Sequence, residues 1–160
     1  MEKKRMNDKG FSLVELIIVI AIMAILIGVL APQYLKFVER SRKSADRDTV
    51  DQIIRAVQID AADPMSTTTS WNGVITLTTT PTAVANPGNC NTADLANILT
   101  NTGIDKIALK SKQWTDGTNT VATIYIIFTA DTNGNVKAVV SSSNTGTTTN
   151  ITDGANLITE

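Results

Sequence analysis

The chain has 160 residues, 42% of them apolar, a formal net charge of −1, no histidine and one cysteine. Without histidine, the sequence excludes imidazole-based triads, histidine general bases and histidine-ligated metals. The near-zero net charge gives no indication of nucleic-acid binding, and the single Cys90 excludes an intramolecular disulfide.

An apolar segment follows a short basic start. Four basic residues precede it: Lys3, Lys4, Arg5 and Lys9. Residues 16–31 contain no polar side chain, and positions 11–31 hold fourteen Leu, Ile, Val or Phe residues. This length comes close to the ~20 residues that a helix needs to cross a bilayer. A carboxylate costs about 2.5 to 3.5 kcal/mol at the centre of a membrane span and less near its end, where Glu15 lies. We therefore expect the segment to insert although it includes Glu15.

A secretory signal peptide and a simple membrane anchor are two other interpretations of this segment. Signal peptides have an apolar core of about 7 to 15 residues, which is shorter than this run. Val29 and Ala31 could form the small-residue cleavage site, but Pro32 would then stand directly after the cut. A simple anchor explains the run but neither Glu15 nor Gly10. Basic residues flank the run on both sides, so charge alone leaves its orientation open.

A helical pattern continues beyond the apolar run. Residues 33–63 contain neither glycine nor proline, and apolar residues recur there every three, four or seven positions, as on one face of a charged helix. That stripe consists of Leu35, Val38, Ala45, Val50, Ile53, Ile54, Val57 and Ala61. Asp63 precedes Pro64, which disfavours helical geometry at Asp63. The sequence thus predicts one helix over residues 11–63, apolar all round at first and then amphipathic, with a hydrogen-bond ladder loosened at Pro32.

Residues 9–32, KGFSLVELIIVIAIMAILIGVLAP, resemble the N-terminus of the type IV pilins and of the related type II secretion and competence pseudopilins. The resemblance is carried by Gly10, Phe11, Glu15 and the apolar run, and it covers about the first 60 residues. It implies the α+β pilin fold, in which the amphipathic half of a long helix packs on an antiparallel sheet. Three parts follow from it. They are a leader at 1–10, a transmembrane and polymerisation helix at 11–35, and a globular head at 36–160.

The resemblance also implies how the chain is processed. A membrane-embedded prepilin peptidase would cut between Gly10 and Phe11 on the cytoplasmic face and methylate the new amine of Phe11. Glu15 could then meet the α-ammonium of a neighbouring subunit. Such a buried pair adds little net stability, whereas an unpaired buried charge is costly, so the pair would set the axial register. The assembly residues expected on this basis are Phe11, Glu15 and Pro32.

Each of these residues also has an ordinary interpretation. Glu15 lies only four residues after Phe11, so its carboxylate could simply reach the membrane interface. Gly10 could be a loop residue before a helix. Pro32 could be an incidental kink, which membrane helices tolerate.

The function that the resemblance implies is structural rather than enzymatic. The chain would be the major pilin of a type IV pilus, without the C-terminal disulfide of many pilins, in an extracellular filament for adhesion, aggregation or twitching motility. The implied partners are further copies of the chain, the prepilin peptidase, the assembly platform with its ATPase, and the cytoplasmic membrane before assembly. We expect no cofactor and no metal; the surface ligand and any nucleic-acid binding stay open. The alternatives are a pseudopilin of a secretion or DNA-uptake machine, and an anchored binding module that never polymerises.

The remaining chain favours strands and turns, because residues 64–160 hold 23 of the 24 threonines. We expect a loop region at 64–105 that contains a strand within residues 71–80. Residues 91–103 predict a short helix, capped by Asn91 or Thr92 and closed by Gly103. Its apolar face would carry Leu95, Ile98 and Leu99.

An antiparallel sheet is expected in the last third of the chain. Residues 106–114 and 121–130 predict strands, and the second should pair with a strand at 135–142 across Asn133-Gly134, a strong hairpin signal. Residues 131–135 only faintly resemble a calcium loop, and a plain hairpin is the preferred interpretation. The sequence leaves the structure of residues 144–160 open.

Overall fold

The computed structural model describes residues 11–85, 89–115, 120–131 and 135–142. The chain divides into two units, Met1–Val38 and Glu39–Glu160, and the boundary falls within the first helix, α1. The predicted leader, the turn at Asn133-Gly134 and residues 144–160 lie outside the described residues. We refer to the described part of the second unit as the head.

Helix α1 spans Leu13–Ala62 and includes Pro32, so the helix predicted over residues 11–63 is confirmed to within two residues. Within the head, one face of α1 is buried. The buried residues are Asp46, Val50, Ile53, Ile54, Ala56 and Val57. The helix stops where the Asp63 carboxylate accepts a hydrogen bond of 2.8 Å from the amide of Met65. This side-chain hydrogen bond forms a turn and replaces a further helical hydrogen bond.

Three antiparallel strands form the main sheet in the order β1-β6-β7. They are β1 (Gly73–Thr78), β6 (Thr123–Ala130) and β7 (Val136–Ser141), which confirms the strands predicted at 71–80, 121–130 and 135–142. Register places Ile126 opposite both Ile75 and Val140, so these three side chains line the same face. Successive side chains along each strand point to opposite faces of the sheet, so that face is buried and the other is partly exposed.

Helix α2 (Ala93–Asn101) lies where the short helix was predicted. Thr92 is its N-cap, and the Thr92 side chain accepts a hydrogen bond from the amide of Leu95. Gly103 follows with a φ of 82°, the left-handed conformation that favours glycine after a helix. The predicted face is confirmed, since Leu95, Ile98 and Leu99 are buried.

The strand predicted over residues 106–114 is wrong for most of its length. Only its ends are extended, as β3 (Lys106–Ile107), which pairs with β2 (Thr82–Ala83), and β4 (Trp114–Thr115), which pairs with β5 (Thr120–Val121). Between them, the amides of Lys110 and Ser111 donate to a side chain of α1, as described below, and the amide of Leu109 donates to the carbonyl of Thr78 at the end of β1 over 2.8 Å. The segment is therefore a loop held against the helix.

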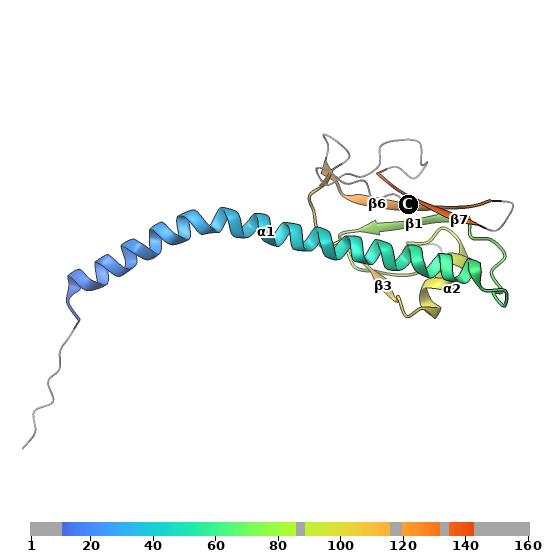
Figure 1. The fold of residues 1–160 in the computed structure, drawn as a ribbon, viewed down its shortest axis with the longest axis horizontal. Coiled ribbons are helices and arrows are strands. Elements are labelled where there is room, and N and C mark those ends of the chain that lie inside the picture. The colour runs from blue at the N-terminus through green and yellow to red at the C-terminus, as the bar shows by residue number, and fades with distance from the viewer. Residues whose placement is uncertain (1–10, 86–88, 116–119, 132–134, 143–160) are drawn as a thin grey trace, which may run out of the picture. The chain divides into compact units, whose positions relative to one another are not determined.

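One hydrophobic core joins these elements. It contains buried residues of α1, α2, the three-stranded sheet and the segment 107–114. Trp114 and Phe128 are the largest fully buried side chains in it. Figure 1 shows the later part of α1 alongside the sheet and α2. The predicted α+β class is confirmed: a long N-terminal helix packs on an antiparallel sheet.

Candidate functional site

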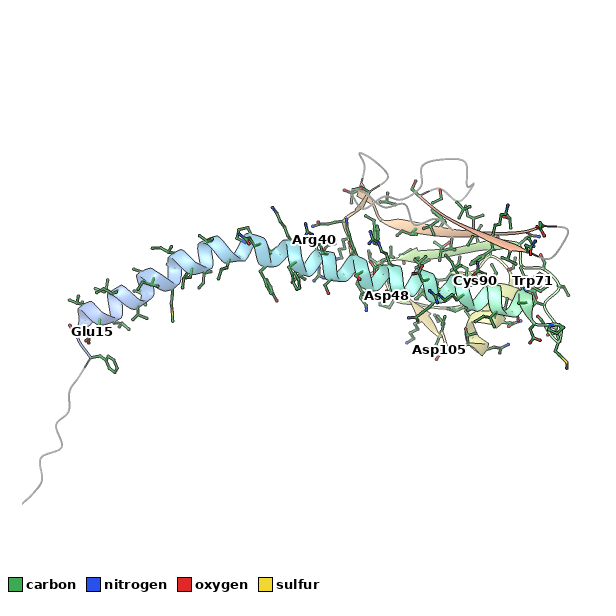
Figure 2. All side chains as sticks on the ribbon, in the orientation of Figure 1. Glu15, Arg40, Asp48, Trp71, Cys90 and Asp105 are labelled. Carbon is green, nitrogen blue, oxygen red and sulfur yellow. The ribbon has the colours of Figure 1, made fainter. Side chains whose placement is uncertain are left out.

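The apolar N-terminal part of α1 presents its side chains to the surroundings. All residues from 11 to 37 are exposed, and Figure 2 shows their side chains projecting from the helix. Among the described residues, α1 is the one helix long and apolar enough to cross a membrane, with a mean hydropathy of 3.1 in its most apolar window. An exposed apolar surface of this extent is typical of a segment that lies in lipid or against other helices.

Ser12 and Glu15 form a capping box at the start of α1. The amide of Ser12 donates to Oε2 of Glu15 over 3.0 Å, and the amide of Val14 donates to Oγ of Ser12 over 3.3 Å. Ser-x-x-Glu before an apolar run is a sequence signature of this cap. This cap was not predicted above, although its spacing is present in residues 12–15. Glu15 thus satisfies an amide at the start of the helix that has no partner within the helix.

The other predicted site residues lie apart from this cap. Phe11 is 95% exposed and precedes the first helical residue. Pro32 lies inside α1, exposed and well beyond the first turn. Gly10 lies outside the described residues. The structure therefore brings Ser12 to Glu15 but does not bring Pro32 to either residue.

A buried carboxylate, Asp46, connects α1 to the loop before β4. Asp46 is 1% exposed and accepts hydrogen bonds from the amides of Lys110 (2.7 Å) and Ser111 (2.9 Å) and from the indole of Trp114 (3.0 Å). Three donors on one carboxylate form a strong, charge-assisted arrangement. No local sequence pattern indicates this contact, because its partners lie more than 60 residues apart in the chain.

Neighbouring side chains extend this attachment. Ser111 donates its hydroxyl to Glu39, which also pairs with Arg42 at 3.6 Å. Lys43 lies 5.4 Å from the ring centroid of Trp114, within the range of a cation–π contact. All these charged groups are engaged within the head, which indicates a structural role.

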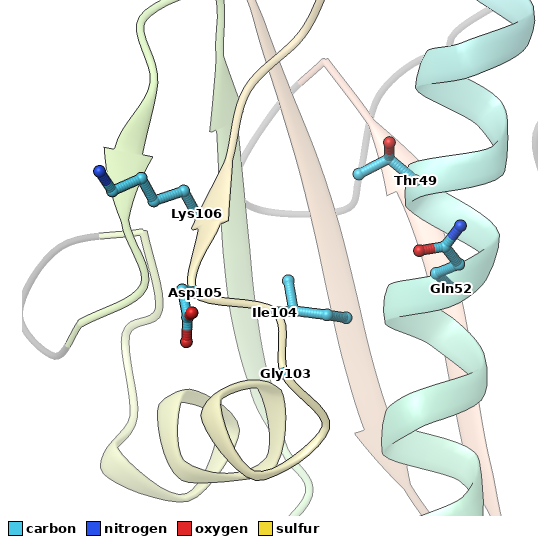
Figure 3. Close-up of a pocket in the computed structure, with 6 residues that line it drawn as sticks. All are labelled: Thr49, Gln52, Gly103, Ile104, Asp105 and Lys106. Carbon is cyan, nitrogen blue, oxygen red and sulfur yellow. The ribbon is translucent and has the colours of Figure 1, made fainter.

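A shallow groove lies between α1 and the segment after α2 (Figure 3). Thr49 and Gln52 line it from the helix, and residues 103–106 line it from the other side. Its volume of about 480 Å³ falls within the range of ligand pockets, but Ile104 is its one large apolar side chain. The described residues contain no group of three acidic, cysteine or histidine side chains placed to hold a metal ion.

Cys90 and the two tryptophans belong to the packing of the head. Cys90 is a free cysteine with no exposed surface, and burial raises the pKa of its thiol to about 11. Trp114 is fully buried, and Trp71 packs against the core while its indole donates to Asp60 over 2.7 Å. Both tryptophans therefore contribute to the packing of the head.

Residues 5–31 match the family model of the prokaryotic N-terminal methylation motif. That motif is the prepilin motif of type IV pilins and pseudopilins, so the resemblance seen in the sequence is confirmed over this segment. The chain thus carries a prepilin motif on a long apolar helix, joined to an α+β head that is consistent with the pilin fold. A search of curated proteins and a search of solved structures found no match.

Proposed function

We propose that the chain is the major subunit of a type IV pilus. The observation that carries this proposal is the exposed apolar helix of residues 11–37 that bears the prepilin motif. In the membrane, lipid would cover this surface before assembly. In a filament, the same surface of other copies would cover it.

Processing would precede assembly. A prepilin peptidase would cut between Gly10 and Phe11 and methylate the new amine. The placement of Phe11 and Ser12 supports this proposal, because both precede the first helical residue and a protease needs a non-helical bond. The processed subunits would then pass to the assembly platform and its ATPase, and emerge as an extracellular filament that serves adhesion, aggregation or twitching motility.

Glu15 would have two successive partners. In the single subunit, its Oε2 accepts the Ser12 amide, while no described residue donates to its Oε1. The cut would create a cationic amine at Phe11, and a neighbour's amine could reach the remaining oxygen of Glu15. Because an unpaired buried charge is costly, this pairing would favour one axial stagger over others. Pro32 would accommodate packing between helices at the end of the polymerisation segment.

Analysis of sheared surface filaments tests the proposal directly. We expect a fibre fraction that contains this protein, with an intact mass and N-terminal sequence starting at N-methylated Phe11. A chain that still starts at Met1 and occurs only in membranes would overturn the proposal and leave an anchored head domain.

A pseudopilin is the second candidate, because pseudopilins carry the same methylation motif. A pseudopilin would also be cut before Phe11 but would form short structures within a secretion or DNA-uptake machine. Electron microscopy of the same cells separates the two functions. Long surface fibres labelled by an antibody to the head support the pilus, and their absence despite normal cleavage supports the pseudopilin.

A further inference from the structure

The outward face of α1 in the head carries a regular row of exposed residues. We call this row the outer stripe. It consists of Arg40, Ser44, Asp48, Asp51, Arg55 and Ile59. Spacings of three and four residues place them on one side of the helix. The buried residues Asp46, Val50, Ile53 and Val57 repeat with the same spacing on the opposite side.

Charge is separated along this part of the helix. Residues 39–47 hold four basic and two acidic side chains, whereas residues 48–63 hold one basic and four acidic side chains. The outer stripe follows this pattern, with Arg40 at its start and Asp48 and Asp51 further along (Arg40 and Asp48 are labelled in Figure 2). The stripe therefore begins with a positive side chain, Arg40, becomes negative at Asp48 and Asp51, and carries a second positive side chain, Arg55, after them.

The charges that define this pattern have no partner within the subunit. Arg40, Asp48 and Asp51 make no hydrogen bond or ion pair in the part of the chain that the structure describes. In contrast, the charged side chains on the inner side of α1, such as Glu39 and Asp46, are engaged by the loop before β4. Ile59, which is 70% exposed, adds an apolar side chain to the same stripe.

A second copy of the chain is complementary to this face if it is parallel and shifted. Parallel copies in the same register would place Arg40 opposite Arg40 and Asp51 opposite Asp51, which is repulsive. An antiparallel copy would point its apolar segment away from that of the first. Arg40 precedes Asp48 by eight residues and Asp51 by eleven. A parallel copy shifted by about 12 to 17 Å along the axis would therefore align opposite charges.

We propose that the outer stripe of one subunit docks on the outer stripe of a parallel second copy, with Arg40 of one copy against Asp48 or Asp51 of the other. This inference rests on the proposed filament, and it assigns part of the choice of stagger to the head rather than to Glu15 alone. The contact is heterologous, because different ends of the stripe meet. Such contacts propagate into open helical assemblies rather than closed dimers.

A charge swap in the full-length protein tests the contact. Arg40→Asp alone should lower the amount of sheared filament by about tenfold or more, because like charges then face each other. One of two second changes, Asp48→Arg or Asp51→Arg, should restore the amount of filament to near the wild-type level. Rescue by Asp48→Arg indicates a shift of eight residues, and rescue by Asp51→Arg a shift of eleven. Normal assembly of Arg40→Asp, or rescue by neither partner, would overturn the inference.

Two controls make the result specific. Lys137→Asp reverses an exposed charge on β7, away from the stripe, and should leave the filament yield unchanged. Cleavage before Phe11 and the thermal unfolding of each variant show that processing and folding are intact. If the wild-type protein itself is never cleaved or never forms filaments, the proposed function fails. If wild type and Arg40→Asp assemble equally, only the stripe contact fails.

A crosslink provides a second measurement that does not depend on assembly yield. Arg40→Cys and Asp51→Cys, expressed together in one cell, should be joined between copies in filaments by a bifunctional thiol reagent, because an arginine–aspartate pair holds its Cβ atoms further apart than the roughly 3.5 to 4.5 Å of a disulfide. The Asp48→Cys partner tests the shorter shift. Absence of both crosslinks in intact filaments would contradict the contact, whereas native Cys90 is buried and should not compete.

Discussion

Glu15 combines two roles that substitutions can separate. As the acid of the capping box, it accepts the Ser12 amide at 3.0 Å; as a filament residue, it would accept a neighbour's amine. Ser12→Ala removes one half of the cap but leaves the carboxylate in place, at an expected cost of about 0.5 to 2 kcal/mol to the helix. Glu15→Val removes both roles.

We therefore expect Ser12→Ala to form filaments and Glu15→Val to form few or none. Loss of the carboxylate leaves an unpaired buried ammonium, which costs about 3 to 5 kcal/mol per contact. Both variants should insert in the membrane and be cut before Phe11. Filament yield after shearing checks the expectation, and a normal yield for Glu15→Val would show that the acid only reaches the interface.

Asp46 should be the most sensitive charged residue of the head. Asp46→Asn replaces an acceptor with an amide that faces backbone donors, and it leaves buried groups without partners. We expect a loss of about 2 to 4 kcal/mol in the free energy of unfolding, measured by urea denaturation of the solubilised protein. Asp105→Asn is a matched control at an exposed position, where a change within about 0.5 kcal/mol is typical. Equal stability of the two variants would refute the structural role of Asp46.

The Cys90 thiol should be inert in the native protein. It has no exposed surface, and its pKa of about 11 leaves little thiolate at neutral pH. We expect no alkylation by iodoacetamide at pH 8 and complete alkylation in denaturant, both measured by intact mass. The backbone of Cys90 pairs with that of Ile75 in an isolated antiparallel β-bridge. Complete labelling without denaturant would show that this backbone pairing opens readily.

Asp60 should make the head sensitive to acid. Its partial burial acts to raise the pKa, but hydrogen bonds from Thr68, Trp71 and Ser66 outweigh this and hold the pKa of Asp60 below its ordinary value. The depressed pKa stabilises the fold above the ordinary carboxylate pKa. This stabilisation is lost as the pH falls from about 4 through the lowered value.

Asp60→Asn should therefore flatten the loss of stability below about pH 4. The melting temperature of both proteins between pH 2 and 7 measures this effect. Identical acid dependence of Asp60→Asn and wild type would show that other carboxylates dominate.

At the scale of elements, local patterns predicted most of the secondary structure. Pro64 after Asp63 located the end of α1, and Thr92 with Gly103 located both ends of α2. The segment 106–114 was mispredicted because Asp46, distant in the chain, accepts the amides of Lys110 and Ser111, which interrupts strand pairing in the middle of the segment. The capping box was visible in the sequence, whereas the Asp46 contact required the fold. Local chemistry can be inferred from spacing, but partners more than 60 residues apart cannot.

Gly73 allows β1 and α2 to approach closely. A Cβ at this position would lie 2.6 Å from Cδ1 of Leu95 and 2.7 Å from Oδ1 of Asn91. Leu95 is fully buried and has little room to move. Gly73→Ala should therefore destabilise the head by about 1 to 3 kcal/mol.

A comparison with Gly103 distinguishes contact from backbone strain. Gly103 has open space around it but a positive φ, so Gly103→Asn should be tolerated well. Gly73→Asn should be poorly tolerated, because its side chain meets Leu95. Thermal unfolding of the two asparagine variants measures the difference, and equal melting temperatures would contradict the close approach.

At the scale of the whole molecule, the two units differ in composition and in what they contribute. The first carries the methylation motif and an apolar surface in which none of the described residues 11–38 is buried, and the second carries the core. The motif predicted the first unit well, since its chemistry is local. The head had to be inferred from strand and turn signals, which indicate single elements rather than their packing.

The attachment of α1 within the head also has a mechanical consequence. Buried side chains from Asp46 to Val57 hold the helix to the sheet and loop over about three turns. A pull along the helix axis would load these contacts together, in shear, rather than peel them apart one after another. A subunit dragged by its helix would thus share the force among the Asp46 hydrogen bonds and the apolar contacts of Val50, Ile53 and Val57, and its head would resist unfolding under tension without a disulfide.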